Sequence, residues 1–108
     1  MRAAYICIIA ITLVSCAKRP ESIEPVAMPA DSYATLDCSM LTADLVRERQ
    51  WLADLIKKQN ETVAGDTIGV LMIGVPTASA TGGDQETAIA IAKGKVNALE
   101  SAVVRRGC

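Results

Sequence analysis

Two long segments of the chain place apolar residues at helical spacing. In the first, residues 39–64, the positions that would face a partner are separated by alternating steps of four and three residues. These positions are Leu41, Leu45, Glu48, Leu52, Leu55, Gln59 and Thr62. In the second, residues 84–106, the same steps recur at Ile89, Ala92, Val96, Leu99 and Val103. Because such steps keep side chains on one face of an α-helix, the pattern predicts an all-α fold, an antiparallel hairpin of two helices.

The predicted connection between these helices, residues 65–83, is unusually apolar. Surface connections are normally polar and short, yet residues 68–75 carry no charged or polar side chain. The side chains expected to form an apolar tip are Ile68, Val70, Leu71, Met72, Ile73 and Val75. The run is too short to span a bilayer. The pattern leaves open whether it prolongs the first helix and packs on the second, contacts another protein, or lies at a membrane interface.

A third apolar run lies at the start of the chain. Residues 3–14 carry no charge and follow Arg2. As a helix this run would measure about 18 Å, whereas the hydrocarbon core of a bilayer is about 30 Å thick. A short apolar run after a positive residue is typical of a secretory signal. We therefore expect residues 1–15 to be a signal peptide that is absent from the mature protein.

The end of this run, Leu13-Val14-Ser15-Cys16, resembles the lipobox of bacterial lipoproteins. The resemblance implies cleavage before Cys16, a diacylglyceryl group on its sulfur, and acylation (palmitate) of the new amino terminus. Lipoproteins retained at the inner membrane often carry aspartate directly after this cysteine, whereas this chain has Ala17. The resemblance therefore implies an outer-membrane lipoprotein that faces the periplasm, with the inner membrane as the alternative.

The segment after the lipobox, residues 16–37, contains three of the four prolines, Pro20, Pro25 and Pro29. Proline removes a backbone donor and disfavours helix at the preceding residue. We therefore expect a flexible linker of extended character between the lipidated cysteine and the helices. The alternative is an irregular arm that packs on the helices.

Two further cysteines flank the predicted helices. Cys38 directly precedes the first and Cys108 directly follows the second. In an antiparallel hairpin of two helices of similar length, both cysteines lie at the same end. A secreted chain with one remaining pair of thiols is expected to join them in a disulfide. Two free thiols, or a link to a second subunit, are the alternatives.

Composition excludes several functions. The chain has 108 residues, a net charge of −1, no histidine and no phenylalanine. Because histidine is the commonest general base and zinc ligand, catalytic triads and most catalytic metal sites are excluded. A near-neutral charge provides no field for nucleic acid. Acidic residues occur singly among lysine and arginine, as on a solvated helix surface. We expect a non-catalytic protein without a metal ion or cofactor, and no nucleic-acid partner.

From Cys38 onward, the pattern G…GVP…GGD…IA…KG…ALE…GC resembles a family of small bacterial lipoproteins. That resemblance implies a helical hairpin and no known reaction. The resulting hypothesis is a lipid-anchored structural or interaction protein of the cell envelope, with an unidentified envelope protein as partner. The alternatives are an accessory subunit of a secretion, conjugation or plasmid-exclusion apparatus, or a phage-type outer-membrane lysis lipoprotein. The sequence leaves homo-oligomer formation open.

Overall fold

The computed structural model describes residues 16–108. The predicted signal peptide, residues 1–15, lies outside the described residues. The described chain forms a 3-10 helix η1 (Pro20–Ser22) and three α-helices: α1 (Cys38–Ile73), α2 (Thr77–Ala80) and α3 (Glu86–Arg106). Residues 16–108 contain no strand, so the all-α class is confirmed for this part of the chain.

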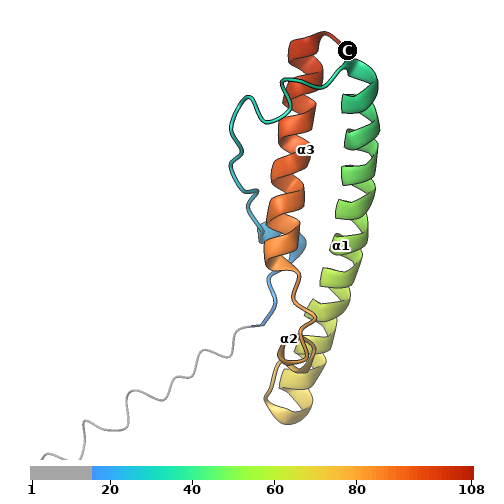
Figure 1. Cartoon of the computed structure of the whole chain (residues 1–108). Helices are drawn as coiled ribbons and strands as arrows, with labels where there is room; N and C mark the ends of the chain where they lie inside the picture. Colours follow the sequence, from blue (N-terminus) through green and yellow to red (C-terminus); the bar gives the residue numbers. More distant parts are fainter. Residues whose placement is uncertain (1–15) are drawn as a thin grey trace, which may run out of the picture.

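Helices α1 and α3 lie side by side, with the carboxyl end of α3 beside the start of α1 (Figure 1). Their facing side chains form two buried clusters. The cluster nearer the start of α1 consists of Leu41, Leu45, Val96, Leu99 and Ala102. The other consists of Ile23, Leu55, Ile89 and Ala92. Most members are positions that the four-and-three spacing predicts, so burial of the apolar stripe explains why these segments are helical.

Helix α1 is longer than the sequence indicates. The spacing predicts an end at residue 64, but the helix continues to Ile73 and ends at Gly74, which adopts the left-handed conformation with φ 74°. Nine residues of the predicted 65–83 connection therefore belong to α1, which agrees with the alternative that the apolar run prolongs the first helix.

The glycines inside α1 mark a close approach. A Cβ atom on Gly69 would lie 2.9 Å from the backbone nitrogen of Thr77 and would collide with the carbonyl oxygen of Val75. A Cβ atom on Gly65 would lie 2.9 Å from the Cβ atom of Ala78. Glycine at both positions therefore allows the chain to fold back tightly on α1 through α2.

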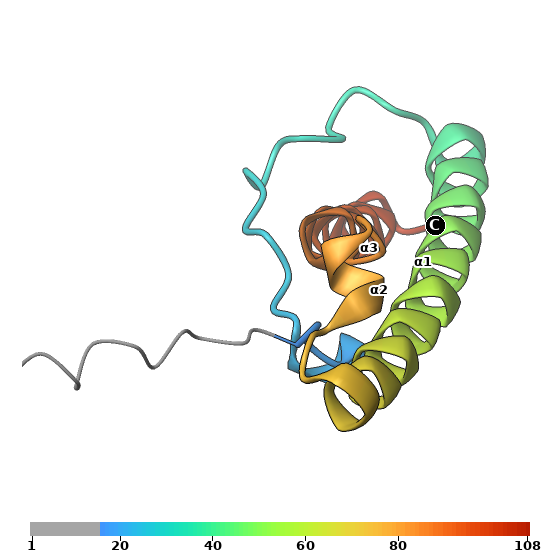
Figure 2. The same ribbon diagram turned by 90° about the horizontal axis from the view of Figure 1, so that it is seen from below.

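Residues 17–37, hereafter the arm, are not the flexible linker expected from the sequence. Figure 2 shows the arm passing along the side of α3 that faces away from α1. The backbone N–H of Val26 donates to the carbonyl of Ala90 at 2.9 Å, and Lys93 donates to two arm carbonyls at 2.6 and 2.7 Å. Ile23 is only 3% exposed. The arm packs on the helices because Ile23 is buried against them and backbone groups of the arm are hydrogen-bonded to α3. This is the alternative that the sequence left open.

Gly94 allows this packing. The carbonyl of Val26 lies so close to α3 that a Cβ atom on Gly94 would overlap its oxygen. We expect Gly94→Ala to push the arm off α3 and break the hydrogen bond to Ala90. Because one hydrogen bond contributes about 1 kcal/mol, amide hydrogen exchange at Val26 should accelerate roughly fivefold.

Asn97→Ala is the matched control, since Asn97 is an exposed position of the same helix and alanine there also raises helix propensity. It should leave the exchange rate of the Val26 amide unchanged. An unchanged rate in Gly94→Ala would contradict the close packing of arm and helix.

Candidate functional site

The described chain begins beside the far part of α1. Cys16 is exposed and outside any disulfide. The next residue, Ala17, is buried, and its backbone N–H donates to Oδ2 of Asp66 at 2.8 Å. Asp66 lies two turns before the end of α1, at Ile73. The predicted lipidation site is therefore held at the same end of the molecule as the apolar tip, a juxtaposition visible in Figure 1, where the described chain starts near α2.

Asp66 joins three segments of the chain. It is fully buried, and besides Ala17 it accepts hydrogen bonds from the backbone N–H of Ser79, at 2.7 Å, and from the Ser79 hydroxyl. Burial alone would raise the pKa of Asp66. The hydrogen bonds from Ser79 and from the backbone N–H groups of Ala17 and Ala78 outweigh burial and hold its pKa below the usual value. The carboxylate is thus a charged clamp between α1, the arm and α2.

Gln59, two turns earlier on the same face of α1, makes a second clamp. Its side-chain amide donates to the carbonyl of Lys18 at 2.8 Å and to Asp84 at 2.9 Å, and its oxygen accepts from the N–H of Gln85 at 2.6 Å. Asp84 in turn accepts from the N–H of Glu86, at the start of α3. Gln59, a polar position in the predicted helix stripe, therefore binds the arm and the segment that leads into α3.

The apolar tip extends beyond these clamps. Leu71 and Met72 are 79% and 78% exposed, and Ile68 and Ile73 are also largely exposed. Val75 is exposed to a lesser degree and Val70 is partly buried. Burial against the second helix, one of the three alternatives, does not occur for the exposed members. A contiguous group of exposed large apolar side chains indicates a contact surface. Between residues 16 and 108 every helix is too short or too polar to cross a membrane.

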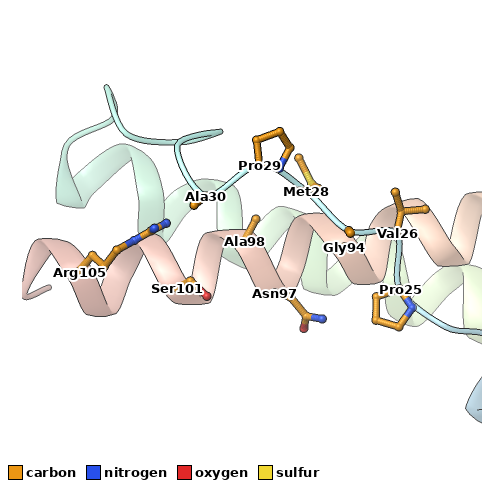
Figure 3. A pocket seen from close by; sticks show the side chains of 11 residues that line it. Pro25, Val26, Met28, Pro29, Ala30, Gly94, Asn97, Ala98, Ser101 and Arg105 are labelled. Carbon is orange, nitrogen blue, oxygen red and sulfur yellow. The ribbon is translucent and has the colours of Figure 1, made fainter.

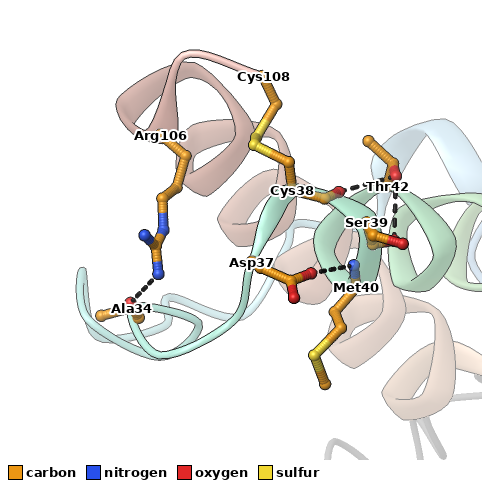
Figure 4. The surroundings of a disulfide bond; sticks show 8 residues. All are labelled: Ala34, Asp37, Cys38, Ser39, Met40, Thr42, Arg106 and Cys108. Atoms are coloured by element: carbon orange, nitrogen blue, oxygen red, sulfur yellow. Dashed lines mark hydrogen bonds between the residues drawn. A yellow bond between two sulfur atoms is a disulfide. The ribbon is translucent and has the colours of Figure 1, made fainter.

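The predicted disulfide is present at the opposite end. Cys38 and Cys108 are joined, with their Cα atoms 5.6 Å apart. Figure 4 shows Asp37 beside it, whose carboxylate accepts from the N–H of Met40 at 2.9 Å and caps α1. Helix α3 ends at Gly107, in the left-handed conformation with φ 72°. Two helix ends are thereby fixed to each other, and the cysteine pairing is confirmed.

The arm also contacts this end. Arg106 donates to the carbonyl of Ala34 at 3.2 Å (Figure 4). Tyr33 packs against the adjacent buried cluster. Burial, and then the negative charge of Glu48, raise the pKa of the Tyr33 hydroxyl. Together with the hydrogen bond between Ala17 and Asp66, these contacts hold both ends of the arm against the helices.

A groove of about 370 Å³ lies between the arm and α3 (Figure 3). Its polar side chains are Asn97, Ser101 and Arg105. None of these side chains can act as a general base for the Ser101 hydroxyl. Within residues 16–108, moreover, no three His, Cys, Asp or Glu side chains gather where a metal ion could bind. We assign the groove no chemistry.

Comparison of the chain with protein-family models, with curated proteins and with solved structures gives no significant match. The sequence predicts the cysteine pair, whereas it gives no direct indication of the part that Asp66 plays in the fold. The available signal was the stripe itself, because one further step of four from Thr62 leads to Asp66 and a step of three leads to Gly69.

Proposed function

We propose that the protein is a lipid-anchored, non-catalytic protein of the bacterial cell envelope. In this proposal Cys16 is the acylated amino terminus of the mature chain, and residues 38–108 form an antiparallel helical hairpin closed by the disulfide. The hairpin stands on the outer membrane, faces the periplasm and contacts an envelope protein. The observation that carries the proposal is the position of Cys16, which is exposed at one end of the helices while its neighbour Ala17 is bound to Asp66.

This position suits an anchor. A single acyl chain gives only marginal membrane attachment, whereas two or more give stable attachment, and the lipobox resemblance implies three. Because Ala17 is fixed to α1, the anchor would hold the folded part directly at the lipid surface. Helix α1 has 36 residues, which corresponds to about 54 Å at 1.5 Å per residue. The end that carries the disulfide would therefore be presented far from the membrane, where an envelope partner can reach it.

Metabolic labelling with an alkyne analogue of palmitate tests the proposal. We expect the wild-type protein, expressed with its full chain in a Gram-negative bacterium, to carry the label and to fractionate with the outer membrane. Cys16→Ser should lose essentially all label. The label is the decisive reading, because uncleaved residues 1–15 would still be apolar and could hold the variant in a membrane fraction.

The double variant Cys38→Ser/Cys108→Ser is the matched control. It removes two cysteines but leaves the lipobox intact, so it should retain the label. An unlabelled wild-type protein, or a label that persists in Cys16→Ser, would contradict the proposal.

A further inference from the structure

We propose that the apolar tip inserts into the lipid surface beside the acyl chains of Cys16. The contact would involve the exposed side chains of Ile68, Leu71, Met72 and Ile73, which would lie at the boundary between the headgroups and the acyl chains. The inference rests on the proposed lipid anchor and adds to it a second, noncovalent membrane contact made by the protein itself.

The apolar tip lies close to the predicted lipidation site. The backbone of Ala17 is hydrogen-bonded to Asp66, and the four tip residues follow Asp66 by two to seven positions on the same helix. At 1.5 Å per residue these positions lie within about 11 Å of Asp66 along the helix axis. An acylated Cys16 would therefore bring the tip to the membrane surface without any rearrangement of the chain.

The chemistry of this end of the molecule also suits a lipid surface. No residue from 67 to 83 is charged, so insertion of this turn would bury no ion. Leu71 and Met72 follow Ile68 by three and four positions, so the three side chains lie on one face of α1. The segment is too short to span a bilayer, but a short apolar face can lie at the interface.

A cationic side chain also lies beside the tip. Arg19 lines a groove of about 450 Å³ together with Thr67, Ile68 and the acidic Glu21. A guanidinium group at the border of an inserted apolar surface would face the phosphate groups of lipid headgroups. Lys18, the other cation next to Cys16, instead pairs with Glu86 at 3.0 Å. The arrangement of apolar side chains with an adjacent arginine fits a phospholipid surface better than a neutral protein groove.

Fluorescence quenching in vesicles tests the inference. The native Trp51 is first replaced by phenylalanine in the full-length, lipidated protein. Met72→Trp then places a single tryptophan at the tip, and Val104→Trp places one at an equally exposed site, 79% against 78%, near the disulfide. Both proteins are incorporated into phosphatidylethanolamine and phosphatidylglycerol vesicles, with or without bromine on the acyl chains.

We expect brominated lipids to reduce the emission of Trp at position 72 about twofold or more, because bromine quenches only groups at acyl-chain depth. Emission from position 104 should be unchanged. Ile68→Trp provides a second tip position in case Met72→Trp alters the turn. Circular dichroism and an intact disulfide verify that each variant is folded.

The outcomes separate the two proposals. Lipidated, vesicle-bound protein whose tip tryptophans are not quenched would overturn the tip inference and leave the anchor in place. The same result with crosslinked dimers through the tip would assign the surface to a second copy of the chain, which also overturns the inference. Protein without the palmitate label would overturn the anchor and the inference together.

Discussion

Replacing Cys38 and Cys108 with serine is expected to lower the free energy of unfolding by about 4 kcal/mol. The two cysteines are 70 residues apart in the sequence and enclose α1, α2 and α3. In the chain-entropy description, a crosslink that closes so long a loop removes much of the freedom of the unfolded chain. A single domain of this size is stabilised by only about 5 to 10 kcal/mol. The disulfide would thus supply a large share of the total.

Urea denaturation monitored by circular dichroism measures this effect. Wild-type protein treated with a reductant should unfold at the same urea concentration as the double serine variant, and oxidised wild-type protein at a much higher one. The double variant itself should not respond to the reductant, which serves as the control. Equal midpoints for oxidised and reduced wild-type protein would contradict the stabilising role of the crosslink.

Asp66→Asn is expected to destabilise the protein by about 1 to 3 kcal/mol at neutral pH. The substitution keeps the size of the side chain but replaces an acceptor oxygen with an NH₂ donor. Both carboxylate oxygens accept hydrogen bonds. Oδ2 accepts from the N–H of Ala17 and from the Ser79 hydroxyl, and Oδ1 accepts from the N–H of Ser79. An amide therefore leaves at least one buried N–H without an acceptor. Asp54→Asn, at an exposed position of α1, is the matched control and should have little effect.

Hydrogen exchange at two places distinguishes a local loss of the Asp66 hydrogen bonds from a general loss of stability. In Asp66→Asn the amide of Ala17 should exchange with solvent much faster, whereas amides in the centre of α3 should change only as much as global stability does. Unfolding at neutral pH that is indistinguishable from that of the wild type would contradict the assigned role of Asp66.

The Asp66 clamp also predicts a pH dependence. The pKa of Asp66 in the folded protein lies below its usual value of 3.8. Its contribution to stability is therefore fully present above the pKa of the unfolded chain and is lost as the pH falls through the lower, folded pKa. The stability difference between wild type and Asp66→Asn should shrink below about pH 3.8. A difference that stays constant between pH 7 and pH 3 would show that the charge of Asp66 has no part in the clamp.

The helix stripes and the cysteine pair could be predicted from the sequence because both depend on local spacing. Leu41, Leu45 and Leu55 are buried on α1, and Ile89 and Leu99 on α3, as the steps of four and three indicate. The cysteines stand at the outer ends of these helices, so their pairing follows from the same pattern.

The sequence left open whether the arm packs on the helices and where α1 ends, because both depend on contacts between distant residues. Glycine often ends a helix, yet Gly65 lies inside α1. Glycine is required there because α2 approaches this position too closely for a side chain. Proline in the arm indicates extended backbone, but it does not reveal that Ile23 is buried or that Lys93 binds its carbonyl. The polar residues Gln59 and Asp66 bind the arm and the return segment, and the helical spacing alone does not reveal these contacts.

Intact mass spectrometry of the detergent-extracted protein measures the chemistry of Cys16 directly. We predict a mature chain that begins at Cys16, carries a diacylglyceryl group and an amide-linked acyl chain there, and retains the Cys38–Cys108 disulfide. A chain that keeps residues 1–15, or one in which Cys16 carries no lipid, would contradict the account.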